Sequence, residues 1–492
     1  MATHVIDLFD GREIMTTARK VLLLEFNEIN WAVIDRLIAE RGAGFLPNFV
    51  RLREQGAWAL QSAVERPPLL DPWITWVTLH TGVSPAVHGA SVLEQDAETI
   101  SAKRTWQYVA EAGRSVGVFG SISAYPPAPL RGFMVPGPFA PSDDTFPASL
   151  RPLQAINRRY TQAHNKTSKA PGALEGLRIG AKLLRLGLRP STCARVAAQL
   201  VRERVSPHAR WRRVSLQPLL NFDFFEKLYR DERPDFATWH SNHEAHYMHH
   251  YWRAWVDSQF TTKSPPAERE KYGEAVPFGY QVCDELLGRA FKLIDDQTVL
   301  VVASSMGQQP YASEKYPDGK IVVRVKDIDK LLQLLGKDGV QEAVPTMVPQ
   351  WNLVVPDAGR RSAIQQQLEG VRRIVAGDSE PGFAVAEVGN ALTVTPLGLA
   401  RMVPGIQYIF PATLLRAESR HSMDELFAAD TPTVKQGMHH INGVLAFYGK
   451  GIKRGTNLAT CTNLDVAPTM LSIMGLSPPA VMEGHVLHDA MA

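Results

Sequence analysis

The sequence predicts an α/β protein with a largely parallel central sheet, and three observations support this fold class. The chain has 492 residues, of which 45% are hydrophobic, which is enough for a large core. Runs such as 20–26 (KVLLLEF) and 298–307 (TVLVVASSMG) contain continuous apolar stretches without polar alternation. This pattern is typical of strands buried on both faces. Helix-like segments separate these runs, and strands that alternate with helices favour a parallel, doubly wound sheet.

The first strand is expected at 20–26. A helix is predicted from Trp31 to Arg41, and a second one from Pro47 to Gln55, which Gly56 ends. This strand–helix opening is the usual beginning of a doubly wound sheet.

Residues 66–89 begin as a proline-rich loop and continue as a helix rich in Thr and Trp. Asp71 is the expected N-cap of that helix, because Pro72 fits the first helical position. Residues 106–124 again combine a helix and a strand.

Residues 151–213 differ from the rest of the chain in charge. They contain fifteen Lys or Arg residues and two Glu residues, a net charge of +13, although the whole chain carries only +3. Within them, 174–188 (LEGLRIGAKLLRLGL) has Leu and Ile at helical spacing with basic residues between them. Two interpretations stay open for 174–213: peripheral contact with an anionic membrane, or a solvated cap helix. Nucleic acid is not expected, because no recognised motif or aromatic interleaving accompanies the charge.

Residues 234–252 (PDFATWHSNHEAHYMHHYW) are the part of the chain richest in candidate site residues. They predict a short buried strand, a polar turn and a helix. Ligands of open α/β sheets collect beyond the carboxyl ends of strands, so several His residues here favour a site. The alternative is that the imidazoles pack at the edge of the core beside Tyr247, Tyr251 and Trp252.

A helix over about 275–294 follows, and residues 311–430 are expected to form an inserted α+β subdomain with strands near 346–355 and 383–395. The end of the chain predicts a loop, a strand, a turn and a helix. The expected organisation is a core at 20–150, a basic helical insertion at 151–230, more core at 231–310, the subdomain at 311–430, and the last part of the core at 431–492.

Polar residues gather at the ends of the predicted strands and at one helix start. Parallel strand ends converge on one edge of a sheet, so these residues are expected to meet there. They are Glu25, Asn27, Glu28, Asn242, His246, Ser304, Ser305, Gln308, Gln309, His439 and His440, with Asp71, Thr75, Thr78 and His80 from the helix start.

On these segments the chain resembles the alkaline phosphatase superfamily, in its nucleotide pyrophosphatase and type I phosphodiesterase branch. The most specific matches are near the end of the chain. They are a Gly-x-His-x-x-x-Gly turn and an Asp-x-x-Pro-Thr helix followed by Gly-Leu and an acidic-Gly turn: Gly437, His439, Gly443, Asp465, Pro468, Thr469, Gly475, Leu476, Glu483 and Gly484. The resemblance implies a three-layer α/β/α domain. It also implies a site with two zinc ions and a Thr or Ser nucleophile that attacks phosphorus or sulfur.

The sequence departs from the family at the implied metal site. Asn27 stands in place of the first metal-binding Asp, and Asn242 in place of the Asp that opens the His-bearing stretch. Ser305 and Met306 replace an Asp-His pair. Neutral amides and a thioether bind zinc weakly, so a standard dinuclear zinc site is not expected.

Two implied ligands, His246 and His439, keep their residue type, whereas the nucleophile position falls near Pro72, with Thr75 as the nearest hydroxyl. A rebuilt site is therefore expected, with one divalent metal, zinc or manganese, on the two histidines and a carboxylate. The assigned roles are catalytic for Glu25, Asp71, Thr75 and His80, substrate-binding for Asn27, Asn242, Gln308, Gln309 and His440, and metal-binding for His246 and His439.

The expected function is an enzyme that acts on a phosphate or sulfate ester, of phosphodiester or glycosyl-phosphate type. The substrate would be an anionic small molecule or lipid-linked. Three alternatives stay open: acid–base chemistry without a metal, conventional hydrolysis by a variant metal site, and a non-catalytic protein that binds an anionic ligand or acts as a scaffold.

Composition gives expectations about location. Three cysteines, far apart in the sequence, indicate no disulfide framework and fit a reducing compartment. Residues 1–19 do not resemble a signal peptide, and no run of about 18 apolar residues predicts a membrane span. The expected location is cytoplasmic, with peripheral contact at the inner face of the membrane as a further option.

Overall fold

The computed structural model describes residues 19–67, 69–90, 97–162, 183–312, 319–336, 338–345, 351–388, 391–397, 405–412, 417–458 and 460–492. The chain forms two compact units. The first, here the core unit, extends to Ser258 and includes Lys263–Gln309 and Gly437–Ala492. The second, the inserted unit, comprises Gln259–Thr262 and Pro310–Gln436, a range that contains the expected subdomain.

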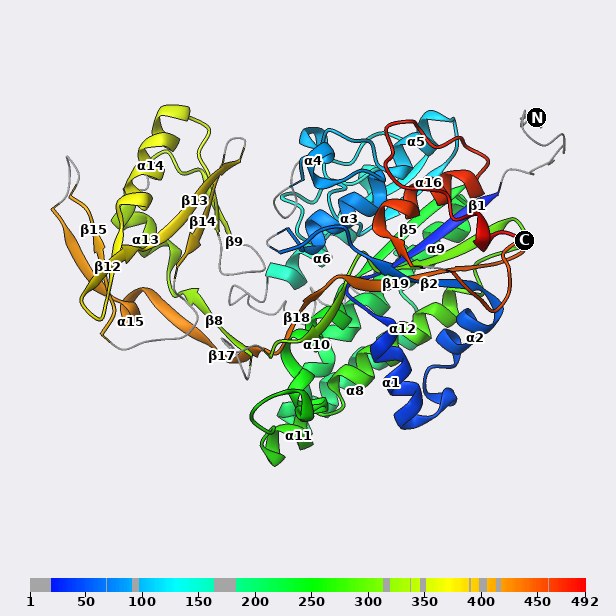
Figure 1. The fold of residues 1–492 in the computed structure, drawn as a ribbon, viewed down its shortest axis with the longest axis horizontal. Coiled ribbons are helices and arrows are strands. Elements are labelled where there is room, and N and C mark those ends of the chain that lie inside the picture. Colours follow the sequence, from blue (N-terminus) through cyan, green and yellow to red (C-terminus); the bar gives the residue numbers. More distant parts are fainter. Residues whose placement is uncertain are drawn as a thin grey trace. The chain divides into compact units, whose positions relative to one another are not determined.

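A nine-stranded sheet forms the centre of the core unit (Figure 1). Its strand order is β20-β2-β19-β6-β1-β5-β3-β4, with β21 paired to β2. The strands are β1 (Lys20–Phe26), β2 (Ala57–Ser62), β3 (Val116–Phe119), β4 (Gly132–Val135), β5 (Phe236–Ser241), β6 (Thr298–Ala303), β19 (Asn442–Tyr448), β20 (Thr456–Asn457) and β21 (Cys461–Thr462).

The sheet is largely parallel, which confirms the predicted α/β class. Strand β1 pairs in parallel with β5 and β6, and β3 pairs in parallel with β4 and β5. Strand β19 is the exception, because it runs antiparallel to both β2 and β6. The register places Glu25 beside His240 of β5, so polar residues from distant parts of the sequence meet where these strands end.

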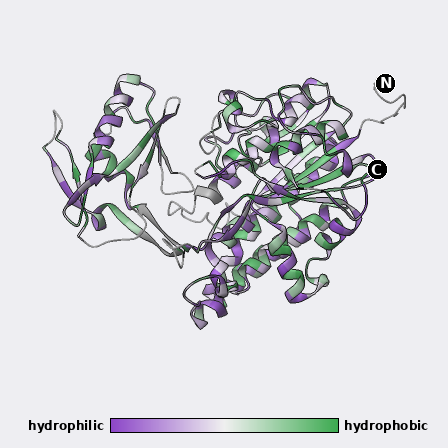
Figure 2. Cartoon of the chain, in the orientation of Figure 1, coloured by the Kyte–Doolittle hydropathy of each residue, from purple (hydrophilic) through white to green (hydrophobic). Residues whose placement is uncertain are grey.

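The apolar runs form the buried centre of the core unit. Strand β1 is buried from Val21 to Phe26, and every residue of β5 and β6 is buried. Figure 2 shows the central strands mainly in the hydrophobic colour, whereas the surrounding helices carry both colours. Continuous apolar strands are expected where both faces of a sheet are covered, and helices lie on both faces here (Figure 1).

Apart from the helix expected over 174–188, the predicted helices of the core unit are present with bounds close to those expected. The first two match the prediction residue for residue. The helices are α1 (Trp31–Arg41), α2 (Pro47–Gln55), α3 (Pro72–Thr81), α4 (Pro85–His88), α5 (Thr105–Glu111), α6 (Arg151–Gln162), α8 (Pro190–Val205), α9 (Leu216–Glu232), α10 (His243–Trp255), α11 (Pro266–Tyr272), α12 (Ala275–Ala290) and α16 (Val466–Ile473). Short 3-10 helices include η1 (Ala43–Phe45), η2 (Ala97–Thr99), η3 (Ala148–Leu150), η4 (Pro207–Ser215), η5 (Asp257–Gln259), η6 (Asn463–Asp465) and η7 (His488–Ala490).

Two further short strands, β7 (Gly307–Pro310) and β18 (Gly437–His440), pair with each other beside the central sheet. They carry Gln308 and His439 to the region where β1 and β5 end. Most of the amphipathic helix expected over 174–188 lies outside the described residues, which resume at 183.

The inserted unit has its own hydrophobic core, formed by residues such as Leu353, Leu368 and Tyr408. Two four-stranded sheets, β13-β14-β10-β9 and β12-β11-β15-β16, make up most of it, and β8 pairs with β17. Its elements are β8 (Lys320–Val325), α13 (Ile328–Leu335), β9 (Glu342–Pro345), β10 (Trp351–Val354), α14 (Ala358–Gly370), β11 (Arg372–Val375), β12 (Asp378–Pro381), β13 (Phe383–Val388), β14 (Ala391–Pro396), β15 (Gln407–Phe410), β16 (Ser419–Ser422), α15 (Met423–Leu426) and β17 (Phe427–Lys435).

Within the described part of the chain, none of the helices combines the length and the apolar character that crossing a bilayer requires.

Candidate functional site

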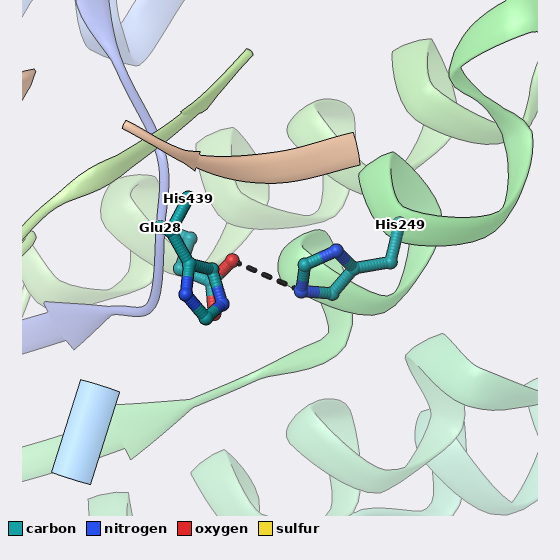
Figure 3. A group of neighbouring side chains, drawn as sticks. All are labelled: Glu28, His249 and His439. Atoms are coloured by element: carbon teal, nitrogen blue, oxygen red, sulfur yellow. Dashed lines mark ion pairs between the residues drawn. The ribbon is translucent and has the colours of Figure 1, made fainter. Parts of the chain in front are cut away.

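Three residues from distant parts of the core unit bring potential metal ligands together (Figure 3). Glu28 lies just after β1, His249 lies on α10, and His439 lies on β18. One ligand atom from each residue lies within 4.8 Å of the other two. We call Glu28, His249 and His439 the carboxylate–histidine cluster.

The two imidazoles approach the same carboxylate. His249 Nε2 lies 3.2 Å from Glu28 Oε2, and His439 Nε2 lies 3.7 Å from Glu28 Oε1. The Glu28 side chain is only 1% exposed, whereas those of His249 and His439 are 13% and 16% exposed. The cluster therefore has a buried carboxylate beside two histidines that are partly exposed.

The other ring nitrogen of each histidine is held by a backbone carbonyl. His249 Nδ1 lies 2.8 Å from Gly437 O, and His439 Nδ1 lies 2.8 Å from Leu70 O. A carbonyl only accepts, so each Nδ1 donates its proton to it, and Nε2 is the ring nitrogen that faces Glu28. This is the arrangement that usually orients metal-binding histidines.

A glycine allows the close approach on which the His249 contact depends. A Cβ atom at residue 437 would lie 2.7 Å from Met248 O and 2.1 Å from Gln308 Oε1. Only Gly437 can therefore bring the β18 backbone against α10 at this point without displacing its neighbours.

Asp71 adds a second carboxylate beside the cluster. Its Oδ1 lies 3.1 Å from His439 Nδ1. The sequence predicted Asp71 as an N-cap, and it does occupy that position of α3, but its side chain makes no capping hydrogen bond. The carboxylate instead contacts the imidazole, where it favours a positively charged or metal-bound ring.

The carboxylate of Glu28 is fixed by two amide side chains. Gln308 Nε2 donates to Glu28 Oε2 and, at 3.0 Å, to Ala245 O. Asn27 Nδ2 donates to Glu28 Oε1 at 3.1 Å. These contacts hold both carboxylate oxygens, so Asn27 and Gln308 position the cluster.

The backbone of Glu28 is strained. Its φ angle is 64°, in the left-handed region that residues other than glycine rarely adopt. Such a conformation costs on the order of 1–3 kcal/mol and is found most often at functional sites. The strain therefore points to the same residue as the ligand geometry.

Neutral side chains bond to one another at the positions where the resemblance implies carboxylate ligands. Asn27 Nδ2 donates to Asn242 Oδ1 at 2.6 Å, and Asn27 Oδ1 accepts from Trp76 Nε1 at 2.8 Å. Ser305 Oγ and Thr75 Oγ1 lie 2.7 Å apart. These groups satisfy each other's hydrogen bonds and contribute no negative charge, so they do not fit a second zinc ion.

Glu25 and His80 belong to a separate buried cluster. Glu25 Oε1 lies 3.1 Å from His80 Nε2, and Glu25 Oε2 lies 3.1 Å from His240 Nδ1. Ser121 Oγ donates to Glu25 Oε1 at 2.8 Å. Burial alone raises the pKa of Glu25, but the charge of His80 and the hydrogen bonds from His240 and His80 outweigh it and hold this pKa at about 2. Glu25 is therefore an ionised, fully enclosed carboxylate.

A second group of potential ligands consists of His243, Glu244 and Cys283, all buried. His243 Nδ1 lies 2.6 Å from Glu244 Oε2, and its Nε2 lies 3.1 Å from Gly279 O. The side chains of His243 and Glu244 are 1% and 0% exposed, so a substrate could not reach a metal ion bound here. This group fits a structural ion pair better than a metal site.

The remaining predicted site residues lie outside the carboxylate–histidine cluster. The ring centroid of His246 lies 4.3 Å from that of His250, so His246 is not among the ligand atoms grouped around Glu28. His440 Nδ1 accepts from Asn442 N at 3.2 Å, and burial lowers the pKa of His440. Gln309 follows Gln308 in β7 and points to the opposite side of that strand. Their assigned roles stay predictions.

The sequence interpretation noted Glu28 as a polar residue but gave it no role, and it did not select His249. The available indication was spacing: His249 follows His246 by three positions, so both lie on neighbouring faces of one helix. Which of the two reaches β18 depends on how α10 packs, which spacing alone does not determine.

Comparison with known proteins does not identify a family: no protein-family model and no curated protein matches the chain.

Proposed function

We propose that this protein is an enzyme that acts on a phosphate- or sulfate-ester substrate through one divalent cation at Glu28, His249 and His439. The observation that supports this most directly is the orientation of the two histidines. Each is held through Nδ1 by a backbone carbonyl, with Nε2 toward one shared carboxylate. Two imidazoles and a carboxylate suit zinc or manganese.

The wider proposal is an alkaline phosphatase-like core whose metal site has been rebuilt. The largely parallel sheet with helices on both faces is compatible with that fold. The residues at the implied zinc positions are neutral and hydrogen-bonded to each other, which supports one cation in place of two.

A bound cation would stabilise negative charge on an ester oxygen and lower the pKa of a nucleophile. The chain's own groups have separate tasks. Asp71 holds His439 in its orientation, and Asn27 and Gln308 hold Glu28. Asn242 uses its carbonyl oxygen to accept from Asn27, so its N–H donors are the groups that would bind an anionic substrate oxygen.

One observation favours a second candidate function, binding of an anionic ligand without turnover. Thr75, the nearest hydroxyl to the implied nucleophile position, is fully buried and hydrogen-bonded to Ser305. A hydroxyl in this state is not placed to attack a substrate. Catalysis in this site would therefore use a water molecule or require Thr75 to change its rotamer.

The test begins with metal binding by the full chain. Protein freed of metal by a chelator is titrated with zinc or manganese in a calorimeter, and we expect one cation per chain. His249→Gln and His439→Gln each remove a ligand, so we expect each to weaken binding by about a hundredfold or more. His440→Gln is the matched control, because it changes the neighbouring histidine of β18 and should bind as the wild type does.

Turnover of a bis-aryl phosphodiester and an aryl sulfate, with and without EDTA, then separates the two functions. EDTA-sensitive hydrolysis that both ligand variants lose supports the enzyme. Metal binding without turnover of either probe supports the binding protein, and a wild-type chain that takes up no cation refutes the metal site itself.

A further inference from the structure

Helix α8 is oriented opposite to an ordinary surface helix. Its polar residues Thr192, Gln199 and Glu203 are buried. Its hydrophobic residues point outward: Leu200 is 47% exposed, Val201 61% and Val205 82%. A surface helix normally buries its apolar face, so this reversal needs a physical cause.

The buried contacts of α8 supply that cause. Glu203 accepts from Arg213, with Glu203 Oε2 and an Arg213 guanidinium nitrogen 2.6 Å apart. Gln199 Nε2 donates to Glu203 Oε1 at 2.9 Å and to Ala209 O at 2.8 Å. These bonds hold the polar face of α8 against η4. The apolar face therefore remains on the outside.

The outer face has a defined pattern of apolar and basic residues. Ala194, Ala197, Val201 and Val205 follow one another at intervals of three or four residues and form one stripe along the helix. At 100° per residue, Arg202 and Arg204 lie on opposite sides of Val201. Both arginines are exposed.

Several arginines of this region have no acidic partner in the part of the chain that the structure describes. Among the described residues, Arg202, Arg204 and the exposed Arg185 take part in no ion pair, whereas Arg189, Arg195 and Arg213 each have an acidic partner. Leu184, in the short helical turn just before α8, is a further exposed hydrophobic residue at 49%. On α8, Val201 thus lies between two arginines that have no ion pair among the described residues.

We propose that the outer face of α8 docks on the surface of an anionic lipid bilayer. Aliphatic side chains would enter the boundary between headgroups and acyl chains, and the flanking arginines would bind lipid phosphates. Charge favours this occupant over a second copy of the chain, because a twofold contact of this face would bring like-charged arginines together. The proposal is independent of the metal site.

The test measures binding of the full chain to vesicles of phosphatidylcholine, with and without about one-third phosphatidylglycerol, by flotation at low salt. We expect binding to the anionic vesicles only. Arg202→Gln with Arg204→Gln should weaken it about 30-fold, because each basic residue near an anionic surface contributes a factor of about five. Val201→Gln with Val205→Gln should weaken it about tenfold or more.

Matched controls keep the experiment decisive. Lys453→Gln with Arg454→Gln removes the same charge from another exposed site, and Val87→Gln with Val481→Gln removes two other exposed valines. Both control variants should bind vesicles as the wild type does. Circular dichroism and melting temperature confirm that each variant is folded.

Three outcomes overturn the proposal. The first is no wild-type binding to anionic vesicles at low salt, and the second is a control pair that weakens binding as much as the α8 pair. The third is that the wild type does not bind vesicles but forms a concentration-dependent dimer in sedimentation velocity, and that Val201→Gln with Val205→Gln dissociates this dimer. This face would then be an interface between two copies.

Discussion

The buried carboxylate of Glu25 gives the sharpest test of the core unit. Glu25→Gln keeps the shape of the side chain but removes its charge. The pKa of Glu25 lies at about 2 in the folded protein, against 4.5 for an ordinary glutamate. That difference corresponds to about 3 kcal/mol of folded-state stability at neutral pH, which the variant should lose.

The pH dependence follows from the sign of the shift. A carboxyl group with a lowered folded-state pKa contributes stability above its unfolded pKa, and this stability is lost as the pH falls toward the folded value. The stabilisation by Glu25 should therefore be complete above about pH 5.5 and fall to less than half of its full value at pH 3. The stabilities of Glu25→Gln and the wild type should converge in acid.

Urea unfolding followed by tryptophan fluorescence is a suitable assay, because nine of the ten tryptophans lie in the core unit. Glu111→Gln is the control: it removes an exposed carboxylate paired with Lys103, and its effect should stay within about 1 kcal/mol. The reasoning is refuted if Glu25→Gln matches the wild type at pH 7, or if its deficit is the same at pH 3.

Two further predictions concern buried groups. Thr78 Oγ1 donates to Glu65 and lies 2.9 Å from His88 Nε2, so Thr78→Val leaves two buried polar groups without this partner. Chemical denaturation should show that the free energy of unfolding falls by about 2–4 kcal/mol. A fall below about 0.5 kcal/mol would contradict the contact. Cys193 is the accessible thiol of the three, since the other two are buried and burial raises their pKa, to about 12 for Cys461. A disulfide reagent at pH 8 should therefore label one thiol per native chain and three after denaturation, and labelling of two or more in the native protein would argue against this burial.

Most of the fold follows from local patterns in the sequence. The apolar run of β1, the helical pattern of α1 and the stop at Gly56 after α2 agree with the structure residue for residue. Of the strands expected in the inserted unit, the one near 346–355 is present as β10 over Trp351–Val354, and its residues 346–350 lie outside the described part. The stretch 383–395 forms two antiparallel strands, β13 and β14. Such predictions succeed because period, length and end signals are properties of neighbouring residues.

The location of the candidate site could also be predicted, but not its full membership. Strand ends were expected to converge, and His439 and Asp71 do meet there. His249 and Glu28 were not assigned as ligands, although they complete the cluster. Their roles depend on how α10 packs against β18 and on the strained backbone at Glu28, neither of which is encoded by local spacing.

The polarity of α8 shows the same limit. The amphipathic helix predicted from the sequence lies at 174–188, before α8, and in an ordinary surface helix the apolar residues would face the core. The structure reverses this, because Arg213 satisfies Glu203 on the inner side. A buried ion pair between two elements decides which face is exposed, and the sequence pattern does not contain that choice.

The sequence by itself determined the α/β class, the position of the main strands and helices, and the neutral residues at the positions where the resemblance implies metal ligands. Only the tertiary structure decided that Asn27 and Asn242 bond to each other, that Asp71 contacts His439, and that His249 reaches Glu28. The reason is physical: these contacts join residues far apart in the chain, and their geometry depends on how whole elements pack.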